Sequence, residues 1–145
     1  MHPSKQFSVE QKEAIVRAIQ EAERNSSGEI RVHIENHCNK NVLDRATQVF
    51  AELNMHKTVL RNGILIYIAL QDRKLAIIGD VGINTKVPTQ CWEQIKDLML
   101  QQFKDGKLCE GICQGILEAG QHLKSFFPYQ EDDINELPDD ISFQN

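Results

Sequence analysis

A short apolar hairpin in the middle of the chain constrains the fold more than any other feature. Residues 64–70 read Ile-Leu-Ile-Tyr-Ile-Ala-Leu, residues 71–73 are polar, and residues 74–79 form a second, largely apolar run. The first run is rich in β-branched side chains, long enough for a strand buried on both faces and too short to cross a bilayer. Because only a short polar turn separates the two runs, they predict an antiparallel hairpin at the centre of a sheet.

One more strand and four helices are predicted around this hairpin. Residues 29–35 alternate between polar and apolar side chains, which indicates a strand with one face in water. Ser8 and Gln11 have the spacing of a capping box, which predicts the start of the first helix. Residues 81–87 read as a loop. Apolar side chains at helical spacing place the starts of the four helices at Ser8, residue 42, Pro88 and Leu108.

The order helix, strand, helix, hairpin, helix, helix predicts an α/β fold, a three-layer α/β/α sandwich with a small mixed central sheet. A strand, a helix and a further strand favour parallel pairing with a right-handed crossover. The strand 29–35 would then run parallel to the first hairpin strand, and Glu29, Arg61, Asn62 and Asp80 would meet at one edge of the sheet. If that pairing is antiparallel instead, Glu35 replaces Glu29 in the group.

The end of the chain is acidic. From Tyr129 to Asn145 there are six Asp or Glu residues and no Lys or Arg. The whole chain has a formal charge of −5, so the body without this segment stands at +1, and we expect no nucleic-acid-binding face. We therefore predict a domain of residues 1–128 and a solvated acidic tail of residues 129–145. Docking of the tail is the alternative, and it rests on four apolar residues: Ile134, Leu137, Ile141 and Phe143.

Composition limits the class of protein further. With 145 residues, 41% of them hydrophobic and 26% charged, the chain has the size and make-up of one globular domain with a core. The first ten residues lack the apolar segment of a signal peptide, and no run is long enough to span a bilayer. We therefore expect a cytoplasmic monomer with no membrane span.

Cysteines and histidines give no metal or nucleophile signature. The four cysteines form no C-x-x-C motif, which favours buried thiols in a reducing compartment. Cys109 and Cys113 are spaced to share one face of a helix, so a soft-metal pair is the alternative. The histidines have no zinc-binding spacing, and no sequence motif marks a nucleophilic residue.

Oxygen-bearing residues follow the second hairpin strand. Asp80, Gly82 and Asn84 form an Asp-x-Gly-x-Asn loop, which offers oxygens at alternate positions, as a hard cation such as calcium prefers. The loop is not an EF-hand, because the required glycine and the terminal glutamate are absent. Taken alone, Asp80 is more typical of a turn or helix entry. With the other residues at the same edge, the predicted metal ligands are Asp80, Glu29, Asn84, Asn62 and Gly82.

Several of these residues lie in segments that resemble the TPM domain family, over about residues 8–128. The resemblance implies an α/β/α sandwich with a small mixed sheet, an association with calcium, and an acidic site that matches Asp80 and Glu29. The family includes a thylakoid-lumen acid phosphatase, a photosystem II repair factor and a receptor modulator, and the short acidic tail resembles its stand-alone bacterial members. The matching segments are 27–32, 55–58, 61–67, 76–84, 87–88, Trp92, 103–106 and Gly111.

Two functions follow from the residues and the resemblance. The first is a calcium-binding module that interacts with, or regulates, an unidentified protein partner. The second is a metal-assisted phosphatase for phosphomonoesters, in which Arg61 clamps the phosphate and Asp80 or Glu29 acts as the base. Calcium binding is favoured, because it needs only oxygen ligands. A purely structural Arg61–Asp80 pair is the third alternative.

Overall fold

The computed structural model describes residues 1–24, 26–128 and 136–145. Its described strands form one four-stranded sheet in the order β3-β2-β1-β4. β1 runs parallel to β2, while β2 and β3 are the antiparallel hairpin, so the predicted mixed sheet and the predicted parallel pairing are both confirmed. Only one strand of the hairpin, β2, is central; β3 is an edge strand, so the prediction of a wholly central hairpin is wrong. The strands are β1 (Glu29–Glu35), β2 (Gly63–Ala69), β3 (Lys74–Gly79) and β4 (Ser142–Phe143).

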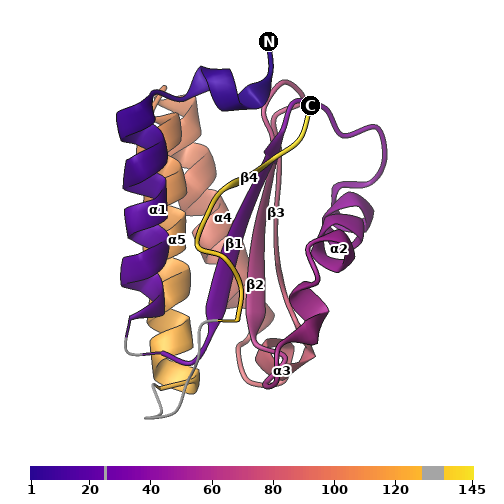
Figure 1. The fold of residues 1–145 in the computed structure, drawn as a ribbon, viewed down its shortest axis with the longest axis vertical. Helices are drawn as coiled ribbons and strands as arrows, with labels where there is room; N and C mark the ends of the chain where they lie inside the picture. Colours follow the sequence, from indigo (N-terminus) through magenta and orange to yellow (C-terminus); the bar gives the residue numbers. More distant parts are fainter. Residues whose placement is uncertain (25, 129–135) are drawn as a thin grey trace.

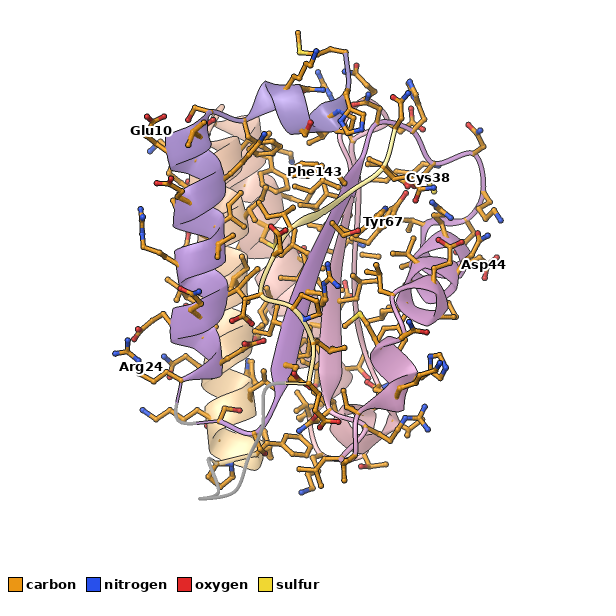
Figure 2. The ribbon with its side chains drawn as sticks, viewed as in Figure 1. Glu10, Arg24, Cys38, Asp44, Tyr67 and Phe143 are labelled. Carbon is orange, nitrogen blue, oxygen red and sulfur yellow. The ribbon has the colours of Figure 1, made fainter. Side chains whose placement is uncertain are left out.

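The sheet lies between two helical layers, which confirms the predicted α/β/α sandwich. In Figure 1, α1, α4 and α5 cover one face of the sheet, and α2 lies on the other. Each face has its own cluster of buried apolar side chains. Figure 2 shows Phe143 on the side of α1 and Tyr67 on the side of α2. The helices are α1 (Val9–Glu23), α2 (Val42–Glu52), α3 (Val81–Asn84), α4 (Thr89–Lys104) and α5 (Leu108–Phe126), with 3₁₀ turns at Pro3–Gln6 and Met55–Lys57.

Local signals explain most of these boundaries. The capping box is present, since the Gln11 N–H donates to Ser8 Oγ at 3.0 Å and the Ser8 N–H donates to Gln11 Oε1 at 2.8 Å. In α5, a Cβ on Gly120 would lie 2.7 Å from Ala22 Cβ, so the glycine permits a close contact with α1. No helix in the described part of the chain has the length and apolar character that crossing a bilayer requires.

Two predictions about local structure are wrong. Residues 81–84 are not loop but the short helix α3, because the Asp80 carboxylate accepts the Val81 N–H at 2.7 Å and caps it. β1 has no face in water: all seven of its residues are buried. Its polar side chains lie beneath α2 and the C-terminal segment, which the alternation of the sequence could not reveal.

The described part of the acidic tail is docked, not solvated. Leu137 and Ile141 are each only 7% exposed, and β4 pairs with the free edge of β1, with Ser142 opposite His33. Figure 1 shows this C-terminal segment running along β1. The docking alternative therefore holds for residues 136–145; Ile134, which also supported it, lies outside the described residues. The domain division at residue 128 stays a prediction.

Candidate functional site

The predicted edge of the sheet exists, and three strands contribute to it. Glu29 of β1 stands opposite Gly63 of β2, and the Asp80 N–H donates to the Gly63 carbonyl at 2.9 Å. Glu29, Gly63 and Asp80 therefore form a row across the sheet with their Cα–Cβ directions on the same face. Over Gly63, however, lie apolar groups: a Cβ there would be 3.4 Å from Met55 Cε and 3.8 Å from Leu137 Cδ1. The two carboxylates share an edge but lie in separate surroundings.

Asp80 forms a bidentate ion pair with Arg61. Arg61 Nε lies 2.7 Å from Asp80 Oδ2, and Arg61 Nη2 lies 2.9 Å from Oδ1. The Asp80 side chain is 4% exposed, whereas that of Arg61 is 45% exposed. The carboxylate is thus a buried, fixed charge, and its counter-charge lies on a side chain with access to solvent.

The backbone at this corner is tightly fitted. Arg61 has a positive φ of 51°, which is uncommon for a residue other than glycine and is found at ordered functional loops. Its carbonyl accepts the Gly82 N–H at 2.9 Å, and a Cβ on Gly82 would lie 2.6 Å from the same oxygen. Gly82 is required because the α3 turn packs directly on this backbone.

The amide N–H groups of the two asparagines at this edge donate to backbone carbonyls. Asn62 Nδ2 donates to the Ser27 carbonyl at 2.8 Å, which joins the starts of β2 and β1. Asn84 Nδ2 donates to the Gly79 carbonyl at 2.9 Å, within the hairpin and α3. Both amides therefore have defined structural roles at the edge.

Glu29 faces the C-terminal segment. Its Oε1 accepts the Leu137 N–H, while Oε2 is buried and has no hydrogen-bond partner among the described residues. Burial raises the pKa of this carboxyl to about 7, against the lowering effect of the N–H groups of Leu137 and Glu136. Glu29 thus binds the docked segment, and with a pKa of about 7 its carboxyl group gains or loses its proton near neutral pH.

Comparison with known proteins identifies the family. The family model of the TPM domain matches residues 2–122. The chain belongs to the TPM domain family. Among solved structures, this TPM domain is similar to the BA42 protein of the psychrophilic bacterium Bizionia argentinensis, with 46% identity, 94% coverage of both chains and a TM-score of 0.88. No curated protein matches the chain.

Two more distant structures share the fold of this TPM domain. The N-terminal domain of a protein from P. gingivalis is 21% identical, with 86% of this chain and 82% of that chain covered and a TM-score of 0.68. The N-terminal domain of the cg2496 protein from Corynebacterium glutamicum is 12% identical, with 92% and 83% covered and a TM-score of 0.68. At these identities the likeness is one of fold alone.

The predicted metal ligands of this TPM domain are all oxygen donors, which suits a hard cation. In the described part of the chain, however, no three Asp, Glu, His or Cys side chains gather as a metal-binding group. The Arg61 guanidinium already neutralises Asp80, and Glu29 is turned toward Leu137. The oxygen donors around Asp80 therefore suit calcium only if the Arg61 side chain moves away from the carboxylate. Calcium binding stays a prediction.

A second polar cluster of the TPM domain was missed by sequence reasoning. Glu35, at the end of β1, accepts hydrogen bonds from Arg45 of α2 at 2.8 and 2.9 Å and also from Tyr67 and His33. Burial would raise the pKa of Glu35, but these donors outweigh it and lower the pKa to about 2. The only signal in the sequence was a run of polar residues at alternate positions, which also suits a wet strand face.

The burial predicted for the cysteines of the TPM domain holds for two of the four. Cys38 and Cys109 are buried, and all four thiols are free. Burial raises the pKa of Cys113 to about 12, so its thiolate is scarce at neutral pH. Cys109 and Cys113 are close on α5 but no further metal-binding side chain joins them among the described residues.

Proposed function

We propose that this TPM domain is a calcium-responsive interaction module centred on Asp80. Calcium would take the place of the Arg61 guanidinium, with oxygens of Asp80 and Asn84 and a carbonyl near Gly82 as its ligands. Its contribution there would be positive charge at a buried carboxylate, which frees Arg61 to contact a partner.

The observation that carries this proposal is the unequal exposure of the ion pair. Asp80 is almost fully buried and is fixed as the cap of α3. Because a buried charge without a partner is costly, its carboxylate must stay paired with a cation. Arg61 is 45% exposed and can leave without unpacking the core. A hard cation with several oxygen ligands is a chemically reasonable replacement.

Exposed apolar side chains beside the ion pair favour a protein partner. Val59 is 82% exposed, Leu60 43% and Val81 56%, and the Gly82–Arg61 hydrogen bond joins the two segments that carry them. Large apolar side chains that gather in water are typical of interaction surfaces. A change in the position of Arg61 would alter the surface beside these side chains.

Thermal unfolding with calcium, and with magnesium as the control ion, tests the proposal. Calcium is expected to raise the melting temperature of the wild type, not that of Asp80→Asn, and to raise that of Arg61→Gln most, because no guanidinium competes there. Arg24→Gln removes an exposed ion pair on α1 and is the matched control. Absence of any shift at millimolar calcium, or an equal shift in Asp80→Asn, contradicts the proposal.

The phosphatase alternative has no specific contact in its favour among the described residues. Arg61, its predicted phosphate clamp, is bound to Asp80. The alternative predicts that hydrolysis of a generic phosphomonoester falls with Asp80→Asn. Activity that survives this substitution would come from a contaminating enzyme.

A further inference from the structure

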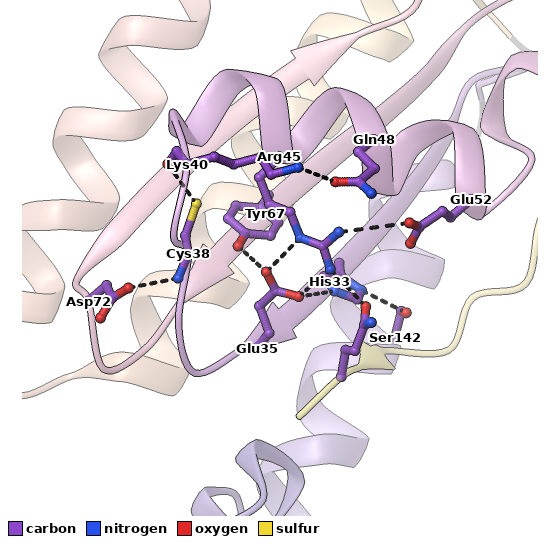
Figure 3. A network of polar contacts seen from close by, with 11 residues as sticks. His33, Glu35, Cys38, Lys40, Arg45, Gln48, Glu52, Tyr67, Asp72 and Ser142 are labelled. Atoms are coloured by element: carbon purple, nitrogen blue, oxygen red, sulfur yellow. Dashed lines mark hydrogen bonds and ion pairs between the residues drawn. The ribbon is translucent and has the colours of Figure 1, made fainter.

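A serine, a histidine and a carboxylate lie in line on the polar face of β1 (Figure 3). Ser142 Oγ is 2.8 Å from His33 Nδ1, and His33 Nε2 is 3.1 Å from Glu35 Oε1. His33 and Glu35 are two residues apart on the same face of β1, and Ser142 stands opposite His33 on β4. Hydrolases of several unrelated folds combine a nucleophile, a base and a group that orients the base in this way. The two nitrogens of His33 are exchanged relative to those enzymes, with Nδ1 toward the serine and Nε2 toward the carboxylate.

In the line formed by Ser142, His33 and Glu35, each hydrogen bond is donated toward Glu35. Glu35 is ionised at neutral pH, so it can only accept, and His33 Nε2 must carry the proton between them. Burial lowers the pKa of His33, against the effect of Glu35, so the imidazole is neutral. Nδ1 is then an acceptor, and the hydroxyl of Ser142 donates to it. This is the ground state that a serine nucleophile with a histidine base requires.

The surrounding side chains hold the line rigid. Arg45 and Tyr67 fix Glu35, and the Tyr67 ring lies parallel to the His33 ring, with centroids 5.9 Å apart. The charged and titratable groups that face His33 come from three elements: Glu35 of β1, Arg45 and Glu52 of α2, and Tyr67 of β2.

Ser142 lies on an edge strand of the sheet, β4, and is partly exposed. The Gln144 N–H donates to the Ile34 carbonyl at 3.0 Å, so the alternation of the strand turns the neighbouring Phe143 N–H away from β1. The N–H that follows a nucleophilic serine is a common donor to the oxyanion of the tetrahedral intermediate.

We propose that Ser142 is the nucleophile of an acyl-transfer site for small carboxylic esters, with His33 as general base and Glu35 as positioning residue. Ser142 Oγ attacks the ester carbonyl carbon while its proton passes to His33 Nδ1. The bond to the leaving alcohol then breaks, and His33 returns the proton to that oxygen. Water repeats the sequence on the acyl-serine, releases the carboxylic acid and restores Ser142.

Covalent labelling of the full chain with a fluorophosphonate tests this site. Ser142 is expected to lose its proton to His33, attack phosphorus and expel fluoride, which gives one adduct that peptide mass spectrometry locates on Ser142. Ser142→Ala should abolish the adduct, and His33→Gln should slow its formation by about a hundredfold, the usual contribution of a general base. Ser27→Ala alters another half-buried, hydrogen-bonded serine and should label like the wild type.

The pH dependence of the labelling rate in the wild type is a second test, which does not depend on whether His33→Gln disrupts the pairing of β4 with β1. With His33 as base, the labelling rate is expected to level off at neutral pH, because the imidazole is already neutral there. A rate that rises in proportion to hydroxide shows a serine without a base and overturns the proposal. An adduct elsewhere in the chain, or no adduct at all, overturns it as well.

Discussion

Replacing Glu29 with glutamine should make the protein more stable above neutral pH. Glu29 is 3% exposed, its Oε2 has no hydrogen-bond partner among the described residues, and burial raises its pKa from 4.5 to about 7. An acid with a raised pKa in the folded state stabilises that state while protonated, and this stability is lost as pH rises through the folded pKa. Each unit of pKa difference is worth about 1.4 kcal/mol, so ionisation of Glu29 costs the folded state about 3 kcal/mol.

The assay is urea unfolding of wild type and Glu29→Gln between about pH 4 and about pH 8. Glutamine keeps an oxygen to accept the Leu137 N–H but cannot ionise. The free energy of unfolding of the variant relative to the wild type should therefore rise by about 3 kcal/mol over this range. Glu10→Gln, which changes an exposed glutamate of α1, controls for the loss of one charge. A difference between wild type and Glu29→Gln that does not vary with pH would refute the reasoning.

Three substitutions test close packing in the fold, each by urea unfolding. Gly82→Ala would place a Cβ 2.6 Å from the Arg61 carbonyl and should cost about 1–3 kcal/mol, with calcium-induced stabilisation reduced; an unchanged stability would contradict the tight corner. Leu137→Ala removes the 7%-exposed side chain that anchors the C-terminal segment and should cost about 2–5 kcal/mol, whereas a solvated tail would show no loss. Gly120→Ala crowds Ala22 of α1 and should likewise cost about 1–3 kcal/mol; a gain from helix propensity would count against that contact.

Local patterns in the sequence were enough to predict most of the strands and helices. The apolar run of residues 64–70 predicted a doubly buried strand, and the strand–helix–strand order favoured the parallel partner that the structure has. The capping box of Ser8 and Gln11 predicted the start of the first helix. These features are local in sequence or follow from the handedness of crossovers.

What the sequence could not give depends on contacts between distant segments. The polar face of β1 looked wet because the residues that cover it, in α2 and after residue 136, have no local relation to it. The Ser142–His33 contact joins positions 109 apart in the chain, so no motif marks it. The Arg61–Asp80 pair was foreseen, but Leu137 and Met55, which separate Asp80 from Glu29, were not.

The most direct test of calcium binding at Asp80 is a calcium titration followed by backbone amide NMR, with magnesium in parallel. Calcium bound at Asp80 should produce saturable shifts at residues 61–63 and 79–84, with tighter binding in Arg61→Gln. Shifts confined to residues 136–140, and reached at the same calcium concentration in the wild type and in Asp80→Asn, would mean that calcium associates loosely with the acidic C-terminal segment. That result would contradict the proposed exchange of Arg61 for calcium.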